Sequence, residues 1–358
     1  MKLKDVKAKL MGKTKTKTKR KLLSSGSTLL NLACTNRVDG AFDAGKYYFF
    51  VGDSQSGKTF LCLGIFAEAA NDSRWDDYRL IYDNVEDGAL MDLRKFFGGK
   101  TAERLEAPME DDEGNQAPSF TIEEFYYNVD DAFSNGPCVY ILDSMDALTS
   151  NQEQDKFKET KKAHRAGKDT TGSFGDGKAK KNAANLRRLF KDMNKHGSIL
   201  IIISQTRDNL KAMNPFDTKT RSGGRALKFY ATLEMWTARK GKIKKTVKGK
   251  ERVVGIQSKV QVKKNRETGN ETAITVPILR SYGIDDISSC IDFLVSEKHW
   301  KKKGQTIDAD ELDFNGTKEK LIRYIEEEEL VTDLRETVGY VWDEIEKASM
   351  VDRKPKYG

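Results

Sequence analysis

Residues 46–70 read KYYFFVGDSQSGKTFLCLGIFAEAA, and this stretch decides the fold class. Residues 46–52 form a nearly continuous apolar run, which is typical of a strand buried on both faces. Residues 59–72 follow with the pattern of a helix. The eight residues that join the two match the phosphate-loop pattern G-x-x-x-x-G-K-[ST] in full. They are Gly52, Asp53, Ser54, Gln55, Ser56, Gly57, Lys58 and Thr59.

The residue types of this loop suit a nucleoside triphosphate. Glycines let backbone N–H groups wrap a phosphate chain, and the N-terminus of the helix adds the positive end of its dipole. Lys58 would place a cation on the β- and γ-phosphates, and the Thr59 hydroxyl would bind Mg²⁺. Because a strand precedes the motif and a helix follows it, the match is more specific than the bare pattern. The sequence therefore predicts ATP and Mg²⁺ as ligands.

Three more apolar runs end in polar residues, and amphipathic stretches such as 179–197 lie between runs. The runs are YRLIYDN (78–84), CVYILDS (138–144) and GSILIIISQ (197–205). This alternation predicts an α/β fold in which helices cover a mostly parallel sheet. After residue 225 strand follows strand, which predicts an antiparallel extension of the same sheet.

The polar strand ends supply candidate site residues, because the carboxyl ends of parallel strands meet at one edge of a sheet. Asp143 is the candidate carboxylate for the metal, although an acidic strand end taken alone is usually a turn or a cap. Glu86 follows the strand at 78–84 and is the candidate general base. Its neighbours Asp83 and Asp87 are the alternative acidic residues in that segment, and we expect them to be helix-capping or loop residues. Gln205 is a candidate sensor of the γ-phosphate.

Positive charge is concentrated at the N-terminus. The chain has a formal net charge of +8, and residues 1–22 hold ten Lys and Arg against one acid, Asp5. The rest of the chain is close to neutral. We expect residues 1–23 to form a basic tail, with three roles left open: an arm for DNA or a neighbouring subunit, a solubilising tail, or a localisation signal.

Composition excludes several other classes of protein. The four cysteines lie far apart and the chain has only three histidines, which disfavours a zinc site, a disulfide framework or a histidine triad. No apolar run approaches the roughly 18 residues of a membrane span. The N-terminus also lacks the apolar stretch of a secretory signal. We therefore expect a cytoplasmic protein without a membrane segment.

These residues together resemble the RecA family of recombinases, which includes phage-encoded members. The most specific segment is SGGRALKFYATLEMW (222–236), which is similar to the stretch that leaves the family's second DNA-binding loop. DNVEDGALMDLRKFFG (83–98) resembles the segment with the catalytic glutamate and aligns Glu86 with it. ILDSMDAL (141–148) is similar to the metal-site strand, and ISQTR (203–207) to the strand with the glutamine sensor.

The resemblance spans roughly residues 24–349 and implies a domain organisation. We expect a RecA-type core at 24–282 and a small C-terminal α/β domain with its tail at 283–358. Two segments of the core would be DNA-binding loops, at 150–181 and 207–222. Their cations would neutralise phosphates, and an aromatic ring would stack on bases. The residues expected to bind DNA are Lys161, Lys162, Arg165, Arg207, Lys211, Phe216, Lys219 and Arg221.

The resemblance also implies an assembly. VKKNR (262–266) is similar to the strand whose two basic residues, here Lys264 and Arg266, reach the ATP of the neighbouring protomer. We therefore expect an ATP-dependent DNA recombinase that forms a helical filament on single-stranded DNA and pairs it with double-stranded DNA. Two alternatives stay open: a ring-forming DNA translocase or helicase, and a DNA-binding accessory protein in which the nucleotide is structural.

Overall fold

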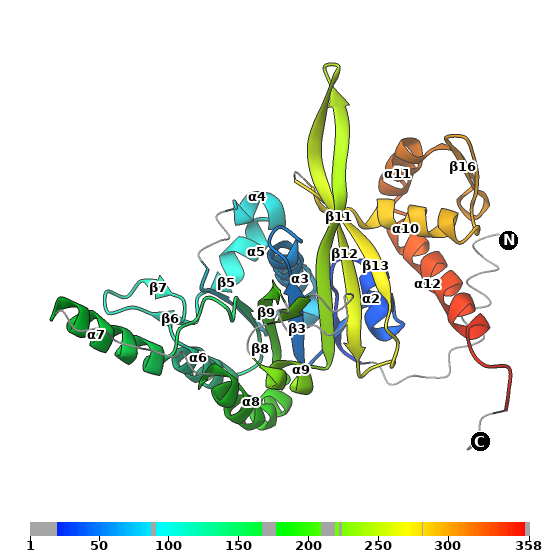
Figure 1. Ribbon diagram of the computed structural model, residues 1–358. Helices are drawn as coiled ribbons and strands as arrows, with labels where there is room; N and C mark the ends of the chain where they lie inside the picture. Colours follow the sequence, from blue (N-terminus) through cyan, green and yellow to red (C-terminus); the bar gives the residue numbers. More distant parts are fainter. Residues whose placement is uncertain are drawn as a thin grey trace.

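A ten-stranded sheet forms the centre of the molecule (Figure 1). The structure, a computed structural model, describes residues 20–86, 91–166, 177–208, 219–221, 224–280 and 282–354. Along the sheet the order is β14-β13-β12-β11-β3-β9-β8-β4-β5, and β10 pairs with β9 outside this path. The strands are β3 (Tyr47–Gly52), β4 (Arg79–Asn84), β5 (Leu105–Glu106), β8 (Cys138–Asp143), β9 (Ile199–Asp208), β10 (Lys219–Arg221), β11 (Leu233–Val247), β12 (Lys250–Asn265), β13 (Ala273–Leu279) and β14 (Gly283–Ile284).

The sheet has a parallel half and an antiparallel half. Strands β11, β3, β9, β8, β4 and β5 run parallel to their neighbours in that order, whereas β12, β13 and β14 are antiparallel. The predicted mixed α/β fold with an antiparallel extension is therefore confirmed. The helices of the core are α2 (Thr28–Thr35), α3 (Lys58–Asn71), α4 (Leu93–Phe97), α5 (Gly99–Arg104), α6 (Ile122–Ser134), α7 (Asn151–Arg165), α8 (Gly177–His196) and α9 (Arg225–Tyr230), with a 3-10 turn at Ser73–Trp75.

Apolar side chains fill both faces of the sheet. On β3 the alternate residues Tyr47, Phe49 and Val51 point into one cluster, which α6, α8 and α9 complete. Tyr48 and Phe50 point into the other cluster, with α2 and α3. All six residues of β3 are buried. The continuous apolar runs of the sequence are thus explained, because each of these strands is covered on both sides.

The C-terminal region forms a small unit at one side of the core (Figure 1). Its apolar side chains belong to the same cluster as α2 and α3. Asp286 joins the two parts, because it accepts hydrogen bonds from the backbone N–H and the hydroxyl of Thr28, each at 2.7 Å. The elements of the unit are α10 (Asp286–Ser296), β15 (Lys301–Lys303), β16 (Thr306–Ala309), a 3-10 turn (Asp310–Leu312), β17 (Phe314–Thr317), α11 (Lys318–Glu327) and α12 (Val331–Ala348).

The structure differs from the sequence-based expectation at three places. Leu22 and Leu23, expected in the tail, form the fully buried strand β1 (Leu22–Leu23), which pairs with β2 (Phe42–Asp43). Helix α7 occupies much of the segment expected as a loop at 150–181; Ser150 caps the backbone N–H of Glu153, and Glu153 caps that of Ser150. The central sheet reaches residue 284, because β14 pairs with β13. A further small hairpin joins β6 (Met109–Glu110) and β7 (Gln116–Ala117).

Within the described residues, the helices are all too short or too polar to cross a membrane.

Candidate nucleotide and nucleic-acid sites

The phosphate loop lies between β3 and α3, at the carboxyl edge of the parallel strands. A Cβ atom on Gly52 would lie 2.1 Å from the hydroxyl oxygen of Thr237, so only glycine fits there. Gly57 has a φ of +93°, a conformation that favours glycine. It caps α3 without a side-chain hydrogen bond, and the first turn of α3 contains no acidic residue. The N-terminal amides of α3 are therefore positioned for phosphate.

Lys58 is held inside this loop. Its ammonium group donates to the carbonyl oxygens of Gly52, at 2.8 Å, and Asp53, at 2.7 Å. Burial lowers the pKa of Lys58, and the carboxylates of Asp143 and Glu86 oppose that shift. The cation is thus desolvated before any phosphate arrives, and this strengthens its attraction for one.

Thr59 and Asp143 meet at the end of β8, where a metal was predicted. The Thr59 hydroxyl donates to a carboxylate oxygen of Asp143 at 2.7 Å, and the Tyr82 hydroxyl donates to the same oxygen at 3.1 Å. Burial raises the pKa of Asp143. A hydroxyl and a carboxylate are oxygen ligands of the kind Mg²⁺ prefers, and Mg²⁺ usually takes its remaining ligands from phosphate and water. Among the described residues, no group of three or more His, Cys, Asp or Glu could hold a metal unaided.

Glu86 and Gln205 lie side by side next to this pair. The Gln205 amide donates to a carboxylate oxygen of Glu86 at 2.9 Å, and the Ser144 hydroxyl donates to the same oxygen. The backbone N–H of Glu86 donates to the carbonyl oxygen of Asp143 at 3.1 Å. The structure therefore brings the predicted base, sensor and metal ligand to one edge of the sheet, and adds Ser144, which sequence reasoning missed.

Asp83, the neighbouring carboxylate, has a structural environment. It is fully buried and accepts hydrogen bonds from the backbone and hydroxyl of Ser119, at 2.8 and 2.6 Å, and from the Tyr140 hydroxyl at 2.7 Å. Burial raises its pKa. These contacts use both carboxylate oxygens, so Asp83 is not a competing base. Asp87, the other neighbour, lies outside the described residues.

The phosphate loop contacts strands that no sequence pattern linked to it. The carboxylate of Asp53 accepts from the Thr206 hydroxyl on β9 and pairs with the ammonium group of Lys219 on β10. The hydrogen bond with Lys219 lowers the pKa of Asp53. Arg239 on β11 donates to the Gln55 side chain at 3.0 Å. The loop is thus tied to β10, which lies within the segment 207–222 that was expected as the second DNA loop.

Lys264 and Arg266 lie away from the phosphate loop of their own chain. Lys264 is opposite Glu234, which itself pairs with Phe49, so it lies three residues before the end of β3, or roughly 10 Å along the strand. Its ammonium group donates to the carbonyl oxygens of Lys228 and Phe229, at 2.6 and 2.8 Å. Arg266 donates to the Phe229 carbonyl at 2.6 Å. The structure does not bring these two cations to the site within one chain.

The residues expected to bind DNA occupy two places. Lys161, Lys162 and Arg165 are exposed on α7, which projects from the core (Figure 1). Arg207 lies opposite Thr220 on the paired strands β9 and β10, 3.6 Å from Asp146. Arg221 is the last residue of β10, opposite Thr206. Lys211 and Phe216 lie outside the described residues.

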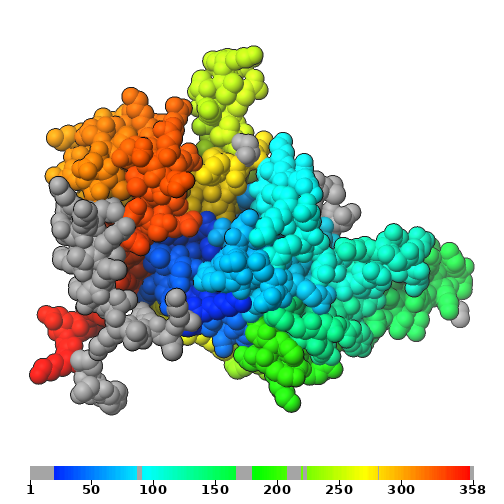
Figure 2. All heavy atoms as spheres, turned by 180° about the vertical axis from the view of Figure 1, so that it is seen from behind, coloured from blue at the N-terminus to red at the C-terminus, as the bar shows by residue number. Residues whose placement is uncertain are grey.

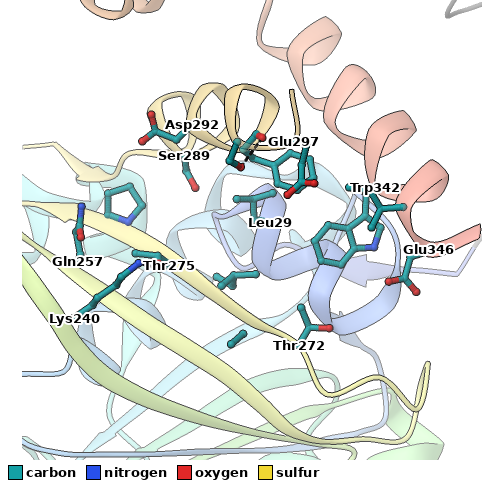
Figure 3. Close-up of a pocket in the computed structure, with 16 residues that line it drawn as sticks. Leu29, Lys240, Gln257, Thr272, Thr275, Ser289, Asp292, Glu297, Trp342 and Glu346 are labelled. Carbon is teal, nitrogen blue, oxygen red and sulfur yellow. Dashed lines mark hydrogen bonds between the residues drawn. The ribbon is translucent and has the colours of Figure 1, made fainter. Parts of the chain in front are cut away.

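A cavity of about 540 Å³ opens between the sheet and the C-terminal helices (Figure 3). Leu29, Trp342 and Thr275 are among its lining residues, and Lys240 reaches it from β11. None of the predicted site residues lines it. The chemistry assigned from the sequence therefore lies elsewhere, at the edge of the parallel strands.

Comparisons with known proteins found relatives that match most of this chain. A family model described as the RecA N-terminal domain matches residues 4–285. "DNA repair protein recA homolog 3, mitochondrial" of Arabidopsis thaliana is 27% identical over 315 residues, which are 86% of this chain and 64% of that protein. "Protein RecA" of Malacoplasma penetrans is 26% identical over 328 residues, which are 91% of this chain and 88% of that protein. "Protein RecA" of Laribacter hongkongensis is 28% identical over 303 residues, which are 82% of this chain and 74% of that protein.

Proposed function

This chain belongs to the RecA family, and on that premise we propose that it is an ATP-dependent DNA recombinase. It would assemble head to tail on single-stranded DNA and pair that strand with a homologous duplex. The observation that carries the proposal is the convergence of Lys58, Thr59 with Asp143, and Glu86 with Gln205 at one edge of the sheet. The protein would act in the cytoplasm of a bacterial or phage-infected cell.

The roles of the residues follow from their contacts. Lys58 would exchange two carbonyl oxygens of its own loop for phosphate oxygens. Thr59 and Asp143 would hold Mg²⁺, which neutralises charge on the β- and γ-phosphates when it is bound. Glu86 would orient and deprotonate the attacking water. Gln205 donates to Glu86, so a change in the γ-phosphate would reach β9 through this amide.

The positions of Lys264 and Arg266 suit a nucleotide site that two protomers share. Lys264 and Arg266 lie toward the amino end of β3, roughly 10 Å or more from the strand end that carries their own phosphate loop. In a head-to-tail assembly the surface that carries these two cations would face the phosphate loop of the next protomer, because the interface of a filament is heterologous. We propose that these two side chains stabilise the charge on the transferred phosphoryl group of the neighbour.

Hydrolysis of ATP should depend on DNA and on salt. We expect single-stranded DNA to stimulate the ATPase strongly, and the stimulation to fade as salt rises, because phosphate contacts release counterions. The measurement is the steady-state ATPase rate with and without single-stranded DNA at a low and a high salt concentration. A rate that DNA does not change would leave an ATPase but would refute its coupling to DNA.

Replacing Asp53 with asparagine should loosen this coupling. The change removes the charge that holds Lys219 against the phosphate loop and frees that cation for DNA. Because both side chains are about half exposed, the pair is worth less than about 1 kcal/mol, so we expect roughly two- to fivefold tighter DNA binding without nucleotide. The readout is binding of a fluorescent single strand with and without ATP.

The matched control for this variant is Asp39→Asn, which breaks an ion pair with Arg37 outside the site. It should leave the DNA affinity unchanged. Lys219→Ala should weaken DNA binding in the same assay. Nucleotide-free binding by Asp53→Asn that equals or falls below the wild type would contradict the link.

A further inference from the structure

The two longest strands of the sheet continue past it as a free hairpin. Strand β11 pairs with β3 only as far as Thr237, and β12 pairs with β13 only from Gly255 onward. Between these points the described strands pair only with each other, up to the turn after Val247. Figures 1 and 2 show the hairpin rising past both the core and the C-terminal unit. We call residues 242–252 the basic finger. Residues 242–247 are the last six residues of β11, and they span about 20 Å along the strand.

The charged residues of the basic finger are cationic with one exception. It contains one acidic residue, Glu251, and no aromatic residue. All of its charged side chains are exposed. Glu251 pairs with Lys244 at 2.8 Å, which leaves a large positive surplus on a thin ribbon. The six cations are Lys242, Lys244, Lys245, Lys248, Lys250 and Arg252.

The surplus is concentrated on one face of the ribbon. Residues directly opposite each other on paired strands share a face. Lys245 is opposite Arg252, and Val247 is opposite Lys250, so one face presents three cations and no acid. The other face carries Lys244 with its partner Glu251. Like charges placed directly opposite destabilise a hairpin, so the cationic face costs stability unless a polyanion lies against it.

We propose that this cationic face binds the phosphate backbone of double-stranded DNA, with the finger seated in the major groove. The major groove admits a two-stranded β-ribbon. Sites for single strands combine cations with aromatic stacking platforms, and the finger has no aromatic ring. The inference rests on the proposed function, and it assigns the duplex partner to a surface separate from the predicted loops at 150–181 and 207–222.

The test compares two variants of the full-length chain that alter opposite faces of the same hairpin. The first is Lys245→Ala with Lys250→Ala and Arg252→Ala. The second, Lys244→Ala with Glu251→Ala, removes an ion pair without a change in net charge. Binding of a short blunt-ended duplex and of a single strand of the same length, each with a fluorescent label, is measured over a range of salt, with ATP and Mg²⁺ present. Thermal unfolding confirms that both variants are folded.

We expect the first variant to bind the duplex roughly tenfold more weakly or worse at low salt, and its salt slope to fall by up to about 2.7, or 0.9 for each lost phosphate contact. The second should bind within about twofold of the wild type, as expected when no net phosphate-binding charge is lost. Wild-type duplex affinity and slope in the first variant would overturn the inference. Equal losses for duplex and single strand would overturn it too, since the finger would then be a general polyanion contact.

The ATPase separates this inference from the proposed function. If single-stranded DNA does not stimulate the wild-type ATPase, the proposed function fails, whatever the finger binds. If stimulation is normal in the wild type and in the first variant while duplex binding is lost only in the variant, the finger is a duplex site distinct from the loops that drive hydrolysis.

Discussion

Replacing Lys58 with alanine is expected to abolish ATP hydrolysis and, with it, nucleotide-dependent DNA binding. The side chain is buried, and its ammonium group donates two hydrogen bonds inside the phosphate loop. Loss of one preorganised cation at a phosphoryl-transfer site costs on the order of 10²- to 10³-fold in rate, as with other electrostatic groups that act on the transition state. ATP binding should also weaken, because Lys58 contacts the phosphates in the ground state.

The measurements for Lys58→Ala are the ATPase rate, calorimetric titration of a non-hydrolysable ATP analogue, and DNA binding with and without nucleotide. The fold should survive, because water can reach the two carbonyl oxygens once the open loop loses its lysine. Lys95→Ala is the control, since Lys95 is an exposed lysine on α4. Tight ATP-dependent DNA binding by Lys58→Ala would contradict the proposed mechanism.

The strand ends of the site could be predicted because hydrophobicity sets where the strands stop. Buried parallel strands read as continuous apolar runs, and the polar residues at or just after the end of such a run lie near the edge of the sheet. This argument located Asp143, Glu86 and Gln205, and all three lie within one hydrogen-bonded group with Thr59 and Ser144. The phosphate loop could be predicted from its own sequence pattern and from the strand and helix patterns on either side of it.

The contacts across the site could not be predicted in the same way. Asp53 meets Thr206 because β3 pairs with β9, with Gly52 opposite Gln205, and it meets Lys219 because β10 pairs with β9 in one register, with Lys219 opposite Asp208. Sequence carries no local signal for such a pairing. Helix α7 was missed because none of its residues is buried, so it lacks the apolar stripe that reveals most helices. Its signal is the Ser150 and Glu153 capping box.

The basic finger was missed for a related physical reason. A strand is recognised by alternating apolar and polar residues when one face is buried. Residues 242–252 have both faces exposed, so polar side chains point both ways and the alternation disappears. The buried half of the same strands, where Val260 pairs with Thr237, is separated from the tip of the finger by two register shifts. The register of the finger itself is closed by the two-residue turn at Lys248 and Gly249, which both have positive φ.

Mixing two inactive variants should restore ATP hydrolysis if the site is shared between protomers. The first variant is Glu86→Gln, which keeps the phosphate loop but loses the base. The second is Lys264→Ala with Arg266→Ala, which keeps its base but loses the cations proposed to act on the neighbour. Each variant alone should hydrolyse ATP at least about 10²-fold more slowly than the wild type.

In a random equimolar filament, about a quarter of the interfaces would join an intact Glu86 to intact cations, because every interface in a head-to-tail assembly is the same heterologous contact. The mixture should therefore recover about a quarter of the wild-type rate with single-stranded DNA present. Energy transfer between labelled protomers reports whether the two variants assemble together. Mixed assembly without recovery would refute the shared site, because junctions that join an intact Glu86 to intact cations would then exist and remain inactive. Recovery, by contrast, requires that one protomer completes the site of the next, since neither cation reaches the phosphate loop of its own chain.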